Sequence, residues 1–314
     1  MVYLEALSKV VPILLLFALG LFLQRRQFLT SAALAALKKI VLNLALPAAL
    51  FLAFSRVAFE AHYVIVAACV FVACALILVS GRFLRMAAGT AVPYFPALLT
   101  GFEAGMLGYG LFNAVYGAEK LYQFGVIDLG QVIFVFFVLV NWLQRRESQV
   151  QSPAAIVRSF LTTPPITAIL LGIAANALGV TTLLDSGPIG QSVITTLEML
   201  AALTSPLIAL IIGYEMRLEF GQLRAPLRAV LIRLVIWLPL GVLFSVLVID
   251  RVLGLDRGFQ AAVMTMVVLP PPFVIPLYMQ RADQLDQTYV VNTLSLFTLV
   301  TLFAFALVSV LFVG

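Results

Sequence analysis

Ten long apolar runs, separated by short polar or Gly/Pro-containing stretches, occupy most of this 314-residue chain. A helix needs about 20 predominantly apolar residues to cross the hydrocarbon core of a bilayer. The runs cover residues 4–23, 34–55, 62–80, 94–117, 122–143, 160–183, 189–214, 228–249, 258–280 and 289–313. The sequence therefore predicts an all-α integral membrane protein with ten transmembrane helices and short loops.

The composition excludes the soluble classes. Hydrophobic residues make up 63% of the chain and charged residues 11%, and the mean hydropathy is +1.13. A soluble domain is usually about 45–50% apolar and about 25% charged, so this chain has too little polar surface to cover a water-soluble fold. The net charge of +5 comes from basic residues scattered through the loops, so we expect no nucleic-acid partner.

Basic residues are distributed unequally between the two sides of the membrane. Loops that follow odd-numbered runs carry eleven Lys or Arg residues, and loops on the other side carry five. Because cytoplasmic loops carry the excess of Lys and Arg, both termini are predicted outside a bacterial inner (plasma) membrane. Lys38, Lys39 and Arg233 lie one or two turns inside their runs, and we expect their long stems to reach cytoplasmic water. An anionic substrate would then find no Lys or Arg at mid-depth, only backbone amides and polar side chains.

The two halves of the chain resemble each other weakly. Pro12 precedes Gly20 by eight residues in the first run, and Pro164 precedes Gly172 by eight in the sixth. Because each half has an odd number of runs, the second unit would be inserted upside down relative to the first. The sequence therefore predicts two inverted five-helix repeats, over residues 1–147 and 153–314. Such repeats are characteristic of secondary transporters.

Corresponding runs of the two halves both contain helix breakers. The fourth run carries Gly101, Gly105, Gly108 and Gly110 around Glu103, and the ninth carries Pro270, Pro271 and Pro272. Three consecutive prolines cannot lie within a regular helix, and glycines weaken one. The glycines alone could instead serve close helix packing, but the prolines could not. Broken helices at corresponding positions predict a binding site at mid-membrane.

Glu103 lies about midway along its run, where an ionised side chain is costly. Three hypotheses follow. Glu103 takes up a proton together with an anionic substrate, or it selects a cation as substrate or coupling sodium ion, or it is a structural carboxylate neutralised by nearby helix ends.

Other polar residues within the runs complete the candidate site. Asp128 has Gln131 one turn ahead on the same face, and either binds a cation or hydrogen-bonds the broken helices. Ion or proton coupling is assigned to Glu103, Asp128 and Gln131. Substrate binding is assigned to Asn43, Pro47, Glu103, Gly105, Gly108, Gly110, Asn113, Ser205, Pro270, Pro271 and Pro272.

Several motifs, in order along the chain, resemble the auxin efflux carrier family. They are Val41-Leu42-Asn43-Leu44-Ala45-Leu46-Pro47, Thr163-Pro164-Pro165, Thr204-Ser205-Pro206-Leu207 and Tyr116-Gly117-Ala118-Glu119. In its fourth span the family usually carries Asn, Gly, Gly and Pro at relative positions 0, 2, 5 and 7. Here Glu103, Gly105, Gly108 and Gly110 stand at those positions, so the Asn is replaced by a carboxylate and the Pro by Gly.

The resemblance implies a function and a mechanism. Bacterial members of the family are permeases for small carboxylates such as malate or malonate. Spans 1, 2, 6 and 7 would form a scaffold that dimerises. Spans 3–5 and 8–10 would form a domain that moves like an elevator and contains the crossing broken helices. We therefore expect a transporter of a small organic acid, coupled to H⁺ or Na⁺ or uncoupled. A sodium-coupled symporter or a cation/proton antiporter of the related fold is the alternative.

Enzymatic function is not expected. The chain has one histidine and two cysteines, Cys69 and Cys74, which lie on different faces of one predicted helix. It contains no zinc-protease motif and no phosphate-binding loop, so neither a metal nor another cofactor is predicted.

Overall fold

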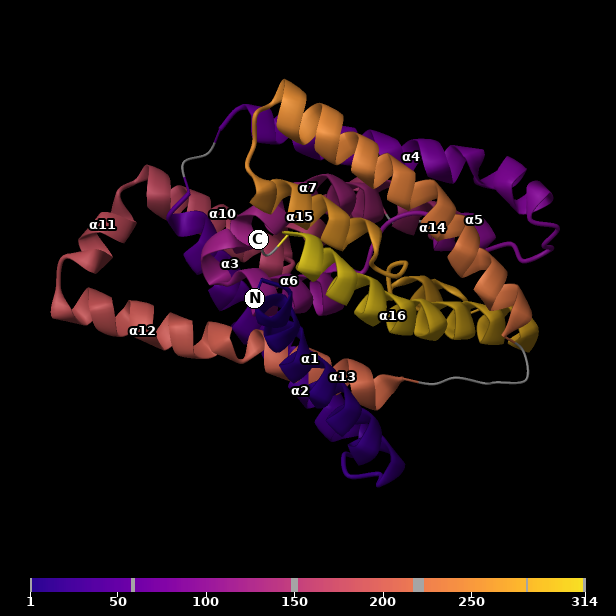
Figure 1. The fold of residues 1–314 in the computed structure, drawn as a ribbon, viewed down its shortest axis with the longest axis horizontal. Coiled ribbons are helices and arrows are strands. Elements are labelled where there is room, and N and C mark those ends of the chain that lie inside the picture. Colours follow the sequence, from indigo (N-terminus) through magenta and orange to yellow (C-terminus); the bar gives the residue numbers. More distant parts are fainter. Residues whose placement is uncertain (1, 58–59, 148–151, 217–222, 281, 313–314) are drawn as a thin grey trace.

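The computed structural model describes residues 2–57, 60–147, 152–216, 223–280 and 282–312, with side chains from Ser8 onward (Figure 1). Helices dominate these residues, and no strand is present among them. Within the described residues, seven helices are long and apolar enough to cross a membrane. They are α1 (Val2–Arg25), α2–η1–α3 (Ser31–Ser55), α4 (His62–Ala87), η3–α7–η4–α8 (Ala118–Arg146), α12–α13 (Pro188–Glu215), α14–η6 (Arg224–Val252) and α16 (Gln284–Phe312).

An eighth candidate is bent. Helices α9 (Pro153–Thr162) and α10 (Pro164–Ala177) meet at an angle of 67°. The residue before a proline is driven out of the helical region, and Thr163, which precedes Pro164, has an extended ψ of 123°. The prediction of one continuous helix over 160–183 is therefore wrong. Gly179 ends the second piece with φ +68°, and the short helix α11 (Val180–Asp185) follows.

Large apolar side chains cover the outside of the helices. Val79, Phe83, Val235 and Phe303 are each more than 70% exposed. A soluble monomer rarely exposes apolar patches of this kind, whereas a bilayer solvates them. Together with the long apolar helices, these exposed faces are those of an all-α membrane protein.

Close helix contacts use glycines. α1 packs along α13 (Thr204–Glu215), where a Cβ on Gly20 would lie 2.2 Å from the carbonyl oxygen of Leu210, and one on Gly213 would lie 2.1 Å from that of Phe17. α4 packs along α7 (Leu121–Phe134) through Gly130, and α3 (Leu46–Ser55) packs along α10 through Gly172. Helices in lipid associate mainly by close van der Waals packing, which small residues permit.

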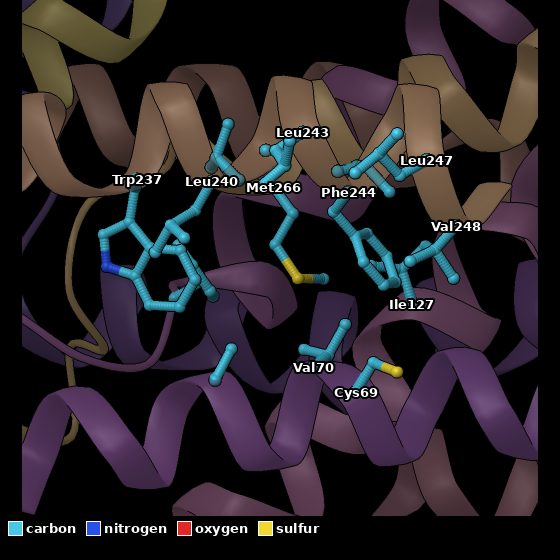
Figure 2. Close-up of a pocket in the computed structure, with 15 residues that line it drawn as sticks. Cys69, Val70, Ile127, Trp237, Leu240, Leu243, Phe244, Leu247, Val248 and Met266 are labelled. Atoms are coloured by element: carbon cyan, nitrogen blue, oxygen red, sulfur yellow. The ribbon is translucent and has the colours of Figure 1, made fainter. Parts of the chain in front are cut away.

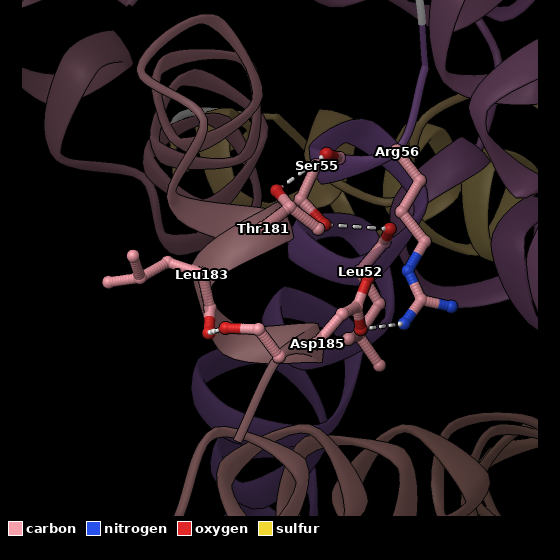
Figure 3. A network of polar contacts seen from close by, with 7 residues as sticks. Leu52, Ser55, Arg56, Thr181, Leu183 and Asp185 are labelled. Atoms are coloured by element: carbon pink, nitrogen blue, oxygen red, sulfur yellow. Dashed lines mark hydrogen bonds and ion pairs between the residues drawn. The ribbon is translucent and has the colours of Figure 1, made fainter.

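Helix α3 is also tied to α11 by polar contacts (Figure 3). Arg56 forms an ion pair with Asp185 at 3.3 Å, and the Thr181 hydroxyl donates to the carbonyl of Ser55 at 2.9 Å. The Asn176 amide donates to the carbonyl of Val57. The two hydrogen bonds satisfy carbonyls at and just beyond the end of α3, where no further helical turn supplies donors.

Two further segments are broken helices. The first comprises α5 (Phe95–Leu98), an irregular stretch over residues 99–103, η2 (Ala104–Gly108) and α6 (Tyr109–Tyr116). The second comprises α15 (Arg257–Val267), an irregular stretch over residues 268–274, and η7 (Ile275–Tyr278). Pro270–Pro272 account for the second break because proline has no N–H to donate. In the first, the chain turns at Gly101, whose φ of +65° favours glycine.

Candidate functional site

The two irregular stretches lie against each other, and we call their meeting point the crossover. The backbone N–H of Glu103 donates to the carbonyl of Pro270 at 2.9 Å. A Cβ on Gly101 would lie 2.8 Å from Cγ of Pro272. The crossover therefore brings together residues about 170 positions apart, and only glycine fits at position 101.

Glu103 joins both sides of the crossover through its carboxylate. One oxygen accepts from the backbone N–H of Met106 at 3.0 Å, and the other accepts from the N–H of Phe273 at 2.6 Å. The first contact caps the start of η2–α6, and the second satisfies the first donor after the triple proline. A helix start carries partial positive charge, so a carboxylate is stabilised there.

Arg233 complements the opposite ends of the broken helices. Its guanidinium donates to the carbonyls of Leu98, Gly101 and Leu269, at 3.1, 2.5 and 3.4 Å. Leu98 ends α5, and Leu269 follows α15 by two residues, so these carbonyls lie at the negative ends of their helices. The guanidinium also lies over the rings of Phe102 and Phe297.

Two expectations about Arg233 are therefore wrong. Its side chain is 1% exposed and does not extend to cytoplasmic water. A basic group does stand at the crossover, although it serves backbone carbonyls. The sequence signal was an arginine inside the apolar run Leu231–Leu238, because an ionisable residue within a membrane span usually has a dedicated partner. The partners themselves are irregular backbone and leave no pattern in the sequence.

Side chains from neighbouring helices satisfy the remaining carbonyls of the breaks. The Trp237 indole N–H donates to Leu99 at 2.8 Å, and the Thr301 hydroxyl donates to Val268 at 2.6 Å. Buried backbone groups without partners are costly. These donors explain how irregular backbone is tolerated inside an apolar protein.

Asp128 and Gln131 form a buried hydrogen-bonded group with Tyr109. Asp128 accepts from the Tyr109 hydroxyl and from the Gln131 amide, both at 2.9 Å. The carbonyl oxygen of the Gln131 side chain in turn accepts from the backbone N–H of Phe102 at 3.4 Å. This arrangement is the hydrogen-bonding alternative considered for Asp128, and it ties α7 to the first break.

The predicted glycines lie after the first break, within helical turns. Gly108 packs against Phe124 and Leu269, where a Cβ would lie 2.6 and 2.7 Å away, and Gly110 packs against Ile208. Both therefore act as packing glycines. Gly105 is half-buried, and a Cβ added at this position would lie 3.9 Å from a carboxylate oxygen of Glu103.

The other predicted residues are divided between the crossover and its surroundings. The Asn113 amide donates to the Ser205 hydroxyl at 3.2 Å, which links α6 to α13. Pro47 is half-buried at the start of α3. Asn43 is exposed on η1 (Val41–Ala45), and among the described residues its side chain forms no hydrogen bond with the crossover.

Two backbone amides beside Glu103 are not used by the described part of the protein. The first N–H groups of a helix have no partner within the helix. At η2 the Glu103 side chain satisfies that of Met106. The N–H groups of Ala104 and Gly105 have no hydrogen-bond partner among the residues that the structure describes.

Two cavities with charged residues in their lining lie near opposite ends of the Ser31–Ser55 helix. One of about 290 Å³ is lined by Lys38, Glu215, Phe273 and Ser295, and Lys38 forms an ion pair with Glu215 at 2.5 Å. The other, of about 680 Å³, is lined by Arg56, Glu60, Glu119 and Glu198. The first reaches the crossover through Phe273, whose N–H binds Glu103.

Comparison with protein-family models and with curated proteins finds no match to this chain. The residues of the crossover are therefore the basis for a functional assignment.

Proposed function

We propose that this chain is a secondary transporter of a small organic anion, such as a dicarboxylate, and that the anion binds at the crossover. The Glu103 carboxylate is the observation that carries the proposal, because it accepts from backbone amides on both sides of the crossover. Backbone amides that donate to the carboxylate of a side chain can equally well donate to the carboxylate of a substrate. The neighbouring amides of Ala104 and Gly105 add to them.

The proposed architecture is that of the auxin efflux carrier family, with ten spans in two inverted repeats. In this scheme α5 to α6 is span 4, the bent α9–α10 pair is span 6, and α15 to η7 is span 9. Helix pairing supports the scheme. Span 1 contacts span 7 (α1 and α13), and the corresponding span 6 contacts span 2 (α10 and α3). In the same way, span 3 contacts span 5 (α4 and α7), and span 8 contacts span 10 (α14 and α16). If each span of the first half is replaced by its counterpart in the second half, and the reverse, each contacting pair is converted into its matching pair, as an inverted repeat requires.

Transport in this proposal moves one group of helices against the other. Spans 1, 2, 6 and 7 form a scaffold, and spans 3–5 and 8–10 carry the crossover past it. The cavities at the two ends of Ser31–Ser55, which have charged residues in their lining, support such a path. Their volumes of about 290 and 680 Å³ are close to or within the range of about 300–1,000 Å³ for ligand pockets, so both can admit a small substrate.

Glu103 couples the substrate to a proton. While ionised, its carboxylate occupies the amides of Met106 and Phe273 and repels another anion. Protonation removes that charge and weakens the hydrogen bonds of Glu103 with both amides. The amides can then donate to a carboxylate of the substrate instead. Proton and anion would then cross the membrane together.

A cation is the second candidate substrate or coupling ion. Glu103 and Asp128 both lie in the crossover region, and Asp128 is 6% exposed. Carboxylates in an apolar site favour Na⁺ or a proton. The hydrogen bonds that both carboxylates already make weigh against this alternative.

Uptake into proteoliposomes tests the proposal. Wild type is expected to accumulate labelled malonate when the outside is acidic, and Glu103→Gln is expected to lose the stimulation by the pH gradient. Asp250→Asn, which changes an exposed carboxylate of η6 (Ser245–Val252) outside both cavities, serves as the matched control and should retain it. If Na⁺ replaces the pH gradient as driving force, the cation alternative holds. If neither gradient drives uptake of any tested small acid, the proposed function is wrong.

A further inference from the structure

An apolar groove of about 240 Å³ lies between α4 and α14–η6 (Figure 2). Val70 and Ala73 of α4 form one wall, and Leu240 and Phe244 of α14 form the other. Met266 of α15 contributes to the floor. No charged residue lines the groove, and its polar groups are limited to the Cys69 thiol and the Trp237 indole, whose N–H is already bonded to Leu99.

The mouth of the groove opens between exposed apolar faces of two helices. Both walls belong to helices that are long and apolar enough to cross a membrane. Exposed side chains flank the groove on each helix, with Val72 and Leu76 on α4 and Val242 and Leu243 on α14. Water is a poor occupant, because a bound water needs polar partners. An empty groove would forfeit the dispersion contacts of its lining.

We propose that the groove binds one acyl chain of a membrane lipid. Its lining extends from Trp237 to Val248 along α14–η6, about 16 Å at the helical rise of 1.5 Å per residue. This is about half of the hydrocarbon thickness of roughly 30 Å, so one leaflet's chain can follow it. A linear, almost entirely apolar lining that opens between exposed apolar helix faces fits an acyl chain and not a polar solute.

The groove ends at the crossover. Trp237 donates to Leu99, and its ring packs edge-on against Phe102 at 4.6 Å between ring centres. Phe102 also lies beneath the Arg233 guanidinium. A bound chain therefore contacts two of the side chains that border the first break. This site is independent of which substrate the protein carries.

Fluorescence quenching by brominated lipid tests the site. The chain has two tryptophans, so Trp142→Phe leaves Trp237 as the only emitter. In phosphatidylcholine bilayers with dibrominated chains, its emission is expected to fall at least two-fold relative to unbrominated bilayers. Ala73→Phe fills the groove from α4 and should restore at least half of the lost emission. Phe244→Ala widens the groove and should deepen the quenching.

Val79→Phe is the matched control, because Val79 is an exposed residue of the same helix that neither lines nor flanks the groove. It should be quenched as strongly as the parent. Equal quenching in the parent, Ala73→Phe and Phe244→Ala would mean that Trp237 senses only lipid around the protein, and would overturn the proposal. An unquenched Trp237 in the parent would overturn it as well. Size-exclusion profiles of each variant identify any that fail to fold.

Discussion

Glu103 and Arg233 bind opposite ends of the same two broken helices. Glu103 accepts from amides at helix starts, and Arg233 donates to carbonyls at helix ends. Each charge therefore meets the part of the backbone dipole that stabilises it, without a direct ion pair between them. Arg suits this task because its planar guanidinium directs several N–H groups in fixed directions.

Replacing Arg233 should destabilise the protein strongly. Arg233→Met leaves three buried carbonyls without donors, each costing about 1–3 kcal/mol, partly offset because a buried charge is also removed. We expect a loss of about 3 kcal/mol and a clearly lower thermal midpoint in detergent. The thermal midpoint of Arg233→Lys should lie between those of Arg233→Met and wild type, because one ammonium group cannot reach all three carbonyls.

Arg228→Met provides the comparison on the same helix. Arg228 is exposed and donates to a single carbonyl, that of Ala88, at 2.7 Å. Arg228→Met should lower the thermal midpoint by only a small fraction of the decrease caused by Arg233→Met. Equal effects at both positions would contradict the role assigned to Arg233.

At the scale of elements, the two breaks differ in how far the sequence predicts them. Pro270–Pro272 remove backbone donors wherever they occur, so the second break follows from composition alone. The first was expected among four glycines, yet only Gly101 has a positive φ, whereas Gly108 and Gly110 lie in helical turns. Glycines that serve packing and glycines that serve a turn look alike in a sequence. The bend at Thr163 was likewise not predicted from the sequence, because Pro164 can begin a helix without bending the segment, and only the structure shows the extended backbone of Thr163.

Gly101→Ala tests the close approach at the crossover. Alanine at φ +65° costs about 1–2 kcal/mol, and its Cβ would in addition lie 2.8 Å from Pro272. Gly179→Ala is matched, because Gly179 has φ +68° and nothing within 4 Å of its Cβ position. The thermal midpoint should fall further for Gly101→Ala than for Gly179→Ala. Equal shifts would mean that the crossover tolerates the added methyl group.

At the scale of the whole molecule, the account requires two groups of helices that move past each other. Composition and run lengths predicted an all-α membrane protein, which the structure bears out with seven long apolar helices. The ten-span repeat and the motion stay predictions. The Asn113–Ser205 hydrogen bond links α6, in the proposed moving group, to α13 in the proposed scaffold.

Linking those two positions should stop transport. With Cys69 and Cys74 replaced by Ala, the pair Asn113→Cys and Ser205→Cys is joined by a short bis-thiosulfonate reagent, which forms a reducible disulfide with each thiol. Malonate uptake is expected to fall at least ten-fold and to recover on reduction. The pair Ser55→Cys and Thr181→Cys lies within the proposed scaffold, where the residues adjoin (Figure 3), and should keep its uptake when joined. Full uptake by the linked Asn113–Ser205 pair would exclude motion between these helix groups.

The most direct test of the central claim is the number of protons taken up when an anion binds. Malonate is added to the purified protein in weakly buffered detergent, and a pH-indicator dye reports proton uptake while calorimetry reports binding. The account predicts about one proton per bound malonate for wild type and none for Glu103→Gln. Binding by wild type without proton uptake, or unchanged uptake in Glu103→Gln, would contradict the coupling role of Glu103.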